Sequence, residues 1–334
     1  MRLEHLSGRR IARRRFIAIM AAAATSPALP GFARADELPT IRWEGIVLGA
    51  ASSLTLQHPD ETAARAAIEA CLAEAARLEA VFSLFRPDSA LARLNAEGRL
   101  EGAPMDLRIL MAEALRLAEA SGGAFDPTVQ PLWALYAAHF SRPDAAPDGP
   151  AAAAIALVRR LVDWRRVRIE GGSIRFAERG MAVTLNGIAQ GYITDRVGDL
   201  LRARGFTHVF VDLGEELALG PKTDGHPWRV GIADPRAPST ALVDVELSDG
   251  AMATSGSYGF SFDPAGRFGH IIDPATGEPA SRWASVTVLA DNATTADGLS
   301  TALSVLPASA VRVLAGDRAR LFVLPTGATE GYWL

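Results

Sequence analysis

The sequence of 334 residues contains a single cysteine, Cys71, so it can form neither an intramolecular disulfide nor a metal site built from several cysteines. It also has no excess of positive charge outside its N-terminal segment. Residues 1–35 contain seven arginines and one glutamate, so the remaining chain has 27 basic and 37 acidic residues, a formal charge of −10. This charge argues against a nucleic-acid partner, because nucleic-acid affinity depends largely on neutralising phosphates with Lys and Arg.

Residues 1–35 have the pattern of a cleavable export signal. Arginines at 13–15 precede a short alanine-rich apolar stretch, and Ala33-Arg34-Ala35 has the small-x-small form of a cleavage site. The stretch is shorter than the roughly 20 residues that span a bilayer, and no later run replaces it. Arg13-Arg14-Arg15-Phe16-Ile17 resembles the twin-arginine export motif, which predicts a periplasmic protein. The alternative is a basic amphipathic helix that stays in the cytoplasm.

The remaining residues, 36–334, are predicted to form one globular α+β unit. Apolar residues recur every three to four positions in 61–81 and 105–120, as in helices that pack one face on a core. Further helices are predicted over 188–204 and from about Thr295, and a surface loop over 142–150. Strands are predicted at 53–57, 182–185, 208–213, 228–232, 241–247 and 285–290. This mixed order favours a largely antiparallel sheet packed against helices.

A carboxylate and a hydroxyl near the C-terminus form a candidate metal site. Thr294 or Thr295 can cap the last predicted helix, which places Asp297 in its first turn. Thr301, four residues further on, then shares a face with Asp297. Both side chains offer hard oxygen ligands of the type that Mg²⁺ takes when water and substrate phosphate fill the rest of its shell. The alternative is that Asp297 only stabilises the positive end of the helix dipole.

Two other segments have the residues of a binding site. Gly187 and Gly191 stand where a predicted strand turns into a helix, a position that suits either a bound phosphate or close helix packing. The glycine spacing and the lysine of a nucleotide-binding loop are missing. His270 precedes a predicted turn at 273–277 and is either a surface residue or a proton acceptor. The pattern of a serine hydrolase is not found.

Several segments together resemble the ApbE family, the FAD:protein FMN transferases, and they span nearly the whole of 36–334. In family order they are FSLFRPDSALARLN from Phe82, GGAFDPTVQPL from Gly122, LNGIAQGYITD from Leu185, VDLGE from Val211, ATSGSY from Ala253, HIIDPATG from His270 and ADGLSTAL from Ala296. The sequence of the segment that begins at Leu185 is most similar to that of members associated with nitrous-oxide reductase maturation.

The resemblance implies a flavin transferase that moves the FMN half of FAD to a Thr or Ser hydroxyl of an acceptor protein, with Mg²⁺ required and AMP released. By motif position, the Asp297 and Thr301 side chains and the Gly187 carbonyl would bind the metal, and His270 is the candidate general base. The FAD contacts implied are Leu48, Phe85, Asp126, Thr128, Thr184, Gln190, Ser255, Gly256, His270 and Ile272. Two alternatives are an FAD pyrophosphatase that gives FMN and AMP, and a non-catalytic exported FAD-binding protein.

The chain departs from the family pattern at four places. Leu48-Gly49-Ala50 stands where the family usually has Met-Gly-Thr, Thr184 where it has Asp, Gln190 where it has Lys, and Glu215 where it has a second Gly. Loss of one Lys and one Asp conserves the charge balance between those two positions. Leu303 stands where the acceptor motif would place the modified Thr, so self-flavinylation is not expected there.

Overall fold

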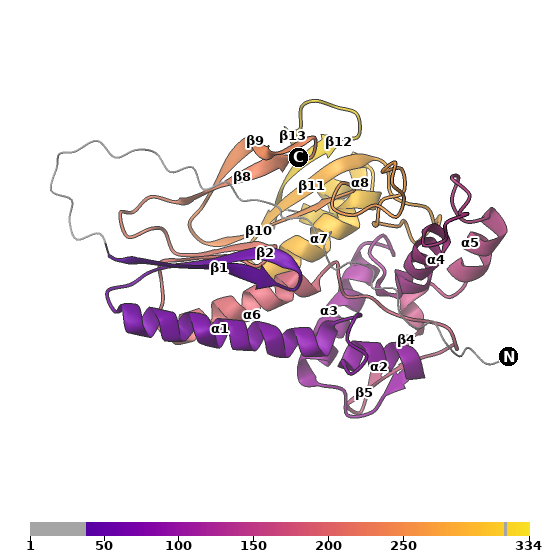
Figure 1. Cartoon of the computed structure of the whole chain (residues 1–334), viewed down its shortest axis with the longest axis horizontal. Helices are drawn as coiled ribbons and strands as arrows, with labels where there is room; N and C mark the ends of the chain where they lie inside the picture. The colour runs from indigo at the N-terminus through magenta and orange to yellow at the C-terminus, as the bar shows by residue number, and fades with distance from the viewer. Residues whose placement is uncertain (1–37, 317–318) are drawn as a thin grey trace.

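The computed structural model describes residues 38–316 and 319–334 (Figure 1). The predicted export segment lies outside the described residues. Within the described part of the chain, no helix is both long and apolar enough to span a bilayer.

Antiparallel pairing joins eight strands into the main sheet, in the order β1-β2-β6-β7-β10-β11-β12-β13. Its strands are β1 (Thr40–Val47), β2 (Ala50–Gln57), β6 (Val209–Asp212), β7 (Glu216–Leu219), β10 (Gly250–Gly256), β11 (Trp283–Ala290), β12 (Ala319–Pro325) and β13 (Tyr332–Trp333). This topology confirms the predicted α+β class with a largely antiparallel sheet.

Different layers cover the two faces of the main sheet (Figure 1). Helices α1 (Glu61–Phe82), α6 (Ala189–Ala203) and α7 (Ala293–Val305) pack on one face, and a two-stranded ribbon of β8 (Trp228–Asp234) and β9 (Ala237–Leu247) packs on the other. Because side chains alternate along a strand, Leu217 and Leu219 of β7 join the helix-side core, while Ala218 joins the ribbon-side cluster. We call these faces the helix side and the ribbon side.

A second group of elements lies beyond one end of α1 and α6 (Figure 1). Its helices are α2 (Ala90–Glu97), α3 (Met105–Ala120), α4 (Gln130–Phe140) and α5 (Ala152–Arg159), with the short 3₁₀ helices η1 (Pro127–Val129) and η2 (Trp164–Arg166). A small sheet pairs β3 (Arg99–Leu100), β5 (Ser173–Phe176) and β4 (Val167–Glu170) in that order. Helix α8 (Ala308–Ala315) follows α7 along the chain.

The helices predicted over 61–81 and 105–120 are confirmed, as are five of the six predicted strands and the loop at 142–150. The strand predicted at 182–185 is wrong. The amide of Asn95 binds both the N–H and the carbonyl of Val183, and Thr184 donates its N–H to the Pro127 carbonyl at 2.8 Å. No strand among residues 38–316 and 319–334 pairs with this segment. Helix α2 was not predicted, and α7 is not the last helix, because α8 follows it.

Candidate functional site

Helix α7 begins at Ala293, earlier than predicted, because two side chains satisfy its first N–H groups. Asn292 accepts the N–H of Thr295 at 2.8 Å, and Asp195 of α6 accepts those of Ala293 and Thr294 at 2.7 and 2.8 Å. The predicted cap at Thr294 or Thr295 is therefore wrong. The predicted place of Asp297 in the first turn is wrong as well, since it is the fifth residue of the helix. The first-turn role belongs to Asp195 and Asn292.

Asp297 is a buried carboxylate directed at α6. It is 4% exposed, and its Oδ2 accepts the N–H of Gly191 at 3.0 Å. Burial raises the pKa of Asp297 to about 7; the Gly191 N–H acts in the opposite direction, and the charge of Asp195 adds to the rise. Perturbed carboxyls of this kind are concentrated at functional sites.

Both glycines of the 185–195 segment lie where a side chain would not fit. A Cβ at Gly187 would stand 2.8 Å from the Thr301 Oγ1, and one at Gly191 would stand 2.2 Å from the Ala293 carbonyl oxygen. The close-packing interpretation of these residues is thus confirmed, and the phosphate interpretation remains a prediction. The lack of a Cβ lets α6 begin directly against the face of α7 that carries Asp297 and Thr301.

Thr301 also contacts β10 of the main sheet. The Ser255 hydroxyl lies 3.3 Å from that of Thr301 and 2.7 Å from that of Ser300. Gly187, Ser255, Asp297 and Thr301, which come from three separate stretches of the sequence, therefore lie together on the helix side of the sheet. The face predicted from the four-residue spacing of Asp297 and Thr301 is the face that gathers these groups.

Two tight turns lie beside this group. Gln190 donates to the Leu213 carbonyl at 3.3 Å, and a Cβ at Gly214 would stand 2.2 Å from the Gln190 amide nitrogen and 3.6 Å from Ala50. Ala50 follows the β1–β2 turn, where Leu48 has the left-handed φ of +53° that disfavours residues other than glycine. The predicted FAD contacts Leu48 and Gln190 thus belong to neighbouring parts of the structure.

The β6–β7 turn also carries a buried carboxylate, Glu215, one of whose oxygens is unpartnered. It is 7% exposed, and its Oε2 has no hydrogen-bond partner among the described residues. Burial raises the pKa of Glu215 well above its usual value, and the charges of Asp297, Glu216 and Asp212 add to this, while the Thr254 N–H lowers it. In the sequence, Glu215 stands out only as a departure from the family pattern.

The donor set around Asp297 fits a hard divalent cation. It comprises one carboxylate, the Thr301 hydroxyl and the Gly187 backbone, all oxygen donors of the type that Mg²⁺ prefers. No three His, Cys, Asp or Glu side chains gather as ligands in the described residues.

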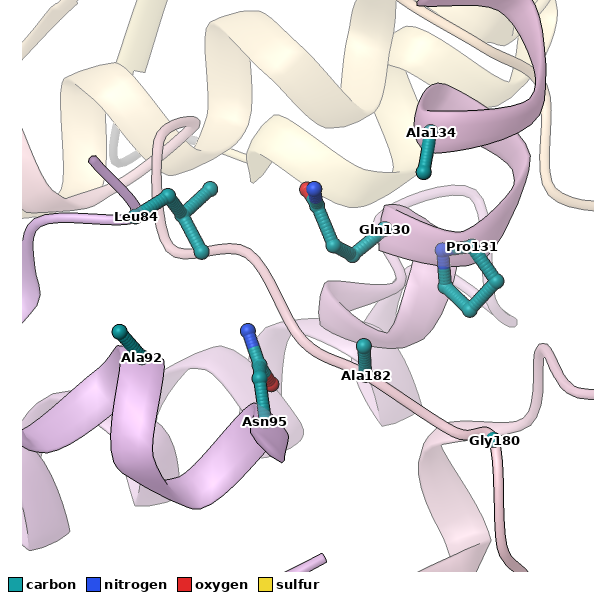
Figure 2. Close-up of a pocket in the computed structure, with 8 residues that line it drawn as sticks. All are labelled: Leu84, Ala92, Asn95, Gln130, Pro131, Ala134, Gly180 and Ala182. Atoms are coloured by element: carbon teal, nitrogen blue, oxygen red, sulfur yellow. The ribbon is translucent and has the colours of Figure 1, made fainter. Parts of the chain in front are cut away.

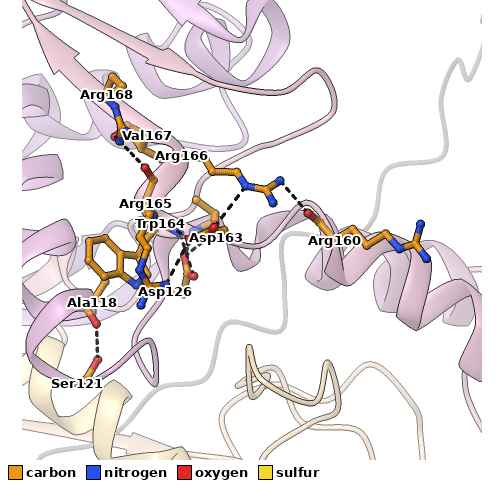
Figure 3. A network of polar contacts seen from close by, with 11 residues as sticks. Ala118, Ser121, Asp126, Arg160, Asp163, Trp164, Arg165, Arg166, Val167 and Arg168 are labelled. Atoms are coloured by element: carbon orange, nitrogen blue, oxygen red, sulfur yellow. Dashed lines mark hydrogen bonds and ion pairs between the residues drawn. The ribbon is translucent and has the colours of Figure 1, made fainter.

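Asp126, Thr128 and Thr184 form a separate cluster around η1. The Asp126 Oδ1 accepts the N–H and the hydroxyl of Thr128 at 2.8 and 2.6 Å. Its Oδ2 accepts the N–H of Trp164 at 3.2 Å, and Figure 3 shows these two residues side by side. Burial raises the pKa of Asp126, and the hydrogen bonds from Thr128 oppose that rise. Thr184 joins the cluster through Pro127. Both Asp126 oxygens hold the fold here, so FAD contact stays a prediction for these residues.

A pocket of about 360 Å³ lies between α2, α4 and the segment before Thr184 (Figure 2). Its lining comprises Leu84, Ala92, Asn95, Gln130, Pro131, Ala134, Gly180 and Ala182. Along the chain these residues neighbour the predicted FAD contacts Phe85, which is 67% exposed, Thr128 and Thr184. None of Gly187, Asp297 and Thr301 lines the pocket, so the metal donor set and the pocket are distinct features of the fold.

His270 lies in the long loop between β10 and β11. Its Nδ1 is 3.0 Å from the Phe260 carbonyl, to which only a protonated Nδ1 can donate, so the neutral ring has a free lone pair on Nε2. Burial lowers the pKa of His270. The turn predicted at 273–277 is confirmed, with Gly277 donating to the Asp273 carbonyl at 2.8 Å.

The remaining two predicted contacts lie in the same stretch of chain. Gly256 ends β10, and a Cβ there would stand 2.3 Å from the Tyr258 ring. Ile272 packs with Leu132 and Tyr136 of α4 in a small separate cluster. This cluster ties the loop that carries His270 to α4. The sequence did not single out Asp195 or Glu215 for a role. The groups that contact them, Ala293 and Thr294 for Asp195 and the Thr254 N–H for Glu215, are remote in sequence.

Comparison with known proteins agrees with this arrangement. The ApbE family model matches residues 48–323. The FAD:protein FMN transferase of Vibrio cholerae is 37% identical over 231 residues, 67% of this chain and 68% of that protein, and that of Treponema pallidum is 38% identical over 263 residues, 72% and 71%.

Solved structures give the same result. The apo form of the flavinyl transferase ApbE of Pseudomonas stutzeri has a TM-score of 0.75 and 31% identity, covering 89% of this chain and 94% of that one. The ApbE protein of Thermotoga maritima has a TM-score of 0.77 and 28% identity, covering 89% and 96%. The resemblance and the fold class predicted from the sequence are confirmed: the chain belongs to the ApbE family.

Proposed function

We propose that the chain is an FAD:protein FMN transferase that uses Mg²⁺ to move FMN from FAD to a Thr or Ser hydroxyl of an acceptor protein, releasing AMP. The names of the relatives support the reaction class. The observation that carries the proposal is the buried group of Asp297, Thr301, Gly187 and Ser255, where α6, α7 and β10 meet. Binding of FAD without cleavage would not require such a set of donors.

The metal donors in this proposal are the Asp297 carboxylate, the Thr301 hydroxyl and the Gly187 carbonyl. A bound Mg²⁺ supplies neutralisation of the negative charge on the FAD diphosphate. Gly191 orients the Asp297 carboxylate through its N–H, and Ser255 positions the Thr301 hydroxyl. These contacts hold the donors in place before substrate binds, so that little reorganisation is required during the reaction.

His270 is the proposed base for the acceptor hydroxyl. The Phe260 carbonyl holds the Nδ1 proton, which leaves Nε2 to take the hydroxyl proton. The acceptor oxygen forms a bond to the phosphorus of the FMN half while the bond from that phosphorus to the bridging oxygen breaks. AMP leaves with the bridging oxygen. The lowered pKa keeps His270 neutral, and therefore able to accept a proton, at neutral pH.

Product analysis tests the proposal against its two alternatives. The purified chain is incubated with FAD and Mg²⁺, with and without candidate acceptor proteins, and both protein mass and nucleotides are measured. We expect an FMN mass addition on an acceptor Thr or Ser together with AMP. Free FMN and AMP regardless of acceptor would instead identify a pyrophosphatase, and intact FAD under all conditions would identify a carrier.

We also propose that residues 1–35 are an export signal of the twin-arginine type and that the mature protein is periplasmic. The arginines, the apolar stretch and the cleavage pattern support this. We expect protein recovered from the periplasm to begin at Asp36, as measured by intact mass. Replacing Arg13, Arg14 and Arg15 by Lys should retain the unprocessed chain in the cytoplasm.

A further inference from the structure

Glu215 is a buried carboxylate, and no basic residue is among the charged groups that act on it in the part of the chain that the structure describes. Its Oε2 lacks a hydrogen-bond partner among the described residues, although the side chain is 7% exposed. The charged groups that act on it are all acidic: Asp297, Glu216 and Asp212. Burial of an unpaired carboxylate is strongly unfavourable, so a residue of this kind either takes up a proton or binds a cation that compensates its charge.

Glu215 immediately precedes β7 and lies within electrostatic reach of Asp297. Leu217 and Leu219 of β7 belong to the helix-side core and Ala218 to the ribbon-side cluster, so Glu216, the first residue of the strand, falls on the ribbon side. Among the charged groups that act on Glu215, Asp297 has the largest effect. Asp297 lies on the helix side with Thr301.

Contacts from α6 and β10 bring Glu215 to the metal donors. Gln190 binds the Leu213 carbonyl of the β6–β7 turn, and the next residue, Gly191, binds the Asp297 carboxylate. On β10, the Thr254 N–H donates to the Glu215 carboxylate, and the next residue, Ser255, contacts Thr301. The residue pairs Gln190-Gly191 and Thr254-Ser255 thus connect the turn that carries Glu215 to Asp297 and Thr301 by hydrogen bonds.

We propose that Glu215 contributes a second carboxylate to the divalent-cation site of Asp297 and Thr301. The inference rests on the proposed function, which assigns the cation to those two residues. A cation between Glu215 and Asp297 satisfies the free Oε2 and offsets both buried charges. Mg²⁺ bound to proteins commonly has one or two carboxylate ligands, so a second carboxylate is compatible with this ion. The full chain should therefore bind the cation before FAD is present.

The inference can be tested without flavin transfer by measuring how tightly the full chain binds Mn²⁺ alone. The electron paramagnetic resonance signal of the free ion reports how much Mn²⁺ remains unbound. Glu215→Gln keeps the shape and removes the charge, and we expect it to weaken Mn²⁺ binding by about tenfold or more. Glu216→Gln is the matched control, a buried neighbour on the ribbon side, and should change binding by less than about twofold. Asp297→Asn should abolish binding.

The outcomes separate the inference from the proposed function. If Glu215→Gln binds Mn²⁺ as tightly as the unchanged chain while Asp297→Asn does not, the role of Glu215 is refuted and the cation site stands. If Asp297→Asn binds Mn²⁺ unchanged, the assignment of the site to Asp297 is refuted, and the inference that rests on it fails too. If the unchanged chain does not bind Mn²⁺ without FAD, the two-carboxylate site is refuted.

Thermal unfolding gives a second test. A residue with a purely structural role would not change the stabilisation of the chain by Mn²⁺. In EDTA at neutral pH, Glu215→Gln should raise the melting temperature, because it removes a carboxyl that burial forces either to take up a proton or to remain charged without a partner. At the same excess of Mn²⁺, the variant should gain less stability than the unchanged chain, because stabilisation by a bound ion increases with the logarithm of the ion concentration divided by its dissociation constant. A lower melting temperature with an unchanged Mn²⁺ gain would overturn the inference.

Discussion

Asp297→Asn separates the charge of the proposed metal ligand from its structural contacts. The amide has nearly the same shape, and its oxygen still accepts the Gly191 N–H that Asp297 accepts at 3.0 Å. The buried negative charge is lost. We therefore expect the variant to fold, with the α6–α7 contact preserved, and to lose flavin transfer.

The expected stability effect follows from the pKa of Asp297. Burial raises it from 3.8 to about 7, so the folded chain binds more protons than the unfolded chain between these values. In EDTA, the contribution of Asp297 to the unfolding free energy therefore falls as the pH rises from about 4 to about 7 and is constant above that. At about 1.4 kcal/mol for each pKa unit, the loss is at most about 4 kcal/mol, and Asp297→Asn should not show it.

The chemical effect is a loss of charge neutralisation at the diphosphate. A metal contribution of several kcal/mol corresponds to a fall in transfer rate of roughly 100-fold to 1000-fold. In-gel flavin fluorescence of an acceptor measures transfer. Urea unfolding in EDTA measures stability at about pH 5, where only part of the loss has occurred, and at about pH 8.5, where the loss is complete. Normal transfer by Asp297→Asn would refute the metal assignment. A variant less stable than the unchanged chain at both pH values would refute the charge argument.

Three further variants test other parts of the site. Asp195→Ala removes the acceptor of two N–H groups of α7, so urea unfolding should show a loss of about 1–2 kcal/mol; an unchanged midpoint would contradict the capping role. Because burial lowers the pKa of His270 from 6.5, the transfer rate should fall only below that pH, and His270→Gln should lose this limb and about 100-fold in rate; a pH–rate profile that keeps the limb would exclude His270 as the base. Gly191→Ala places a Cβ 2.2 Å from the Ala293 carbonyl and should destabilise the chain by about 3 kcal/mol in the same urea assay; normal stability would contradict the close α6–α7 contact.

Elements with a long regular pattern could be predicted from the sequence. The helices over 61–81 and 105–120 repeat apolar residues over several turns, and tertiary contacts confirm rather than alter that preference. The segment 182–185 has the apolar character of a strand, but its polar backbone groups are satisfied by the Asn95 side chain, 88 residues away, and by Pro127. Nothing within the segment distinguishes this arrangement from pairing with a strand.

The first residue of α7 could not be predicted for the same reason. The sequence before Asp297 offers several residues that can cap a helix, and Asn292 is of a type as suitable as Thr294 or Thr295. The contact that decides the start comes from Asp195, which binds Ala293 and Thr294 from nearly 100 residues earlier in the chain. Asp297 and Thr301 share a face whichever residue caps the helix. The prediction that they share a face is therefore correct although the predicted cap is wrong.

The structure also changes the interpretation of the departures from the family pattern. The loss of a Lys at Gln190 and of an Asp at Thr184 conserves charge in total, but the two positions lie in different clusters. Thr184 binds Pro127, whereas Gln190 binds the β6–β7 turn that carries Glu215. Relative to the pattern, this turn and the start of α6 lose one positive charge and gain one negative charge beside Asp297. No basic residue that the structure describes is among the charged groups that act on Glu215. The cation that the proposed chemistry already requires would compensate the negative charge of this carboxylate.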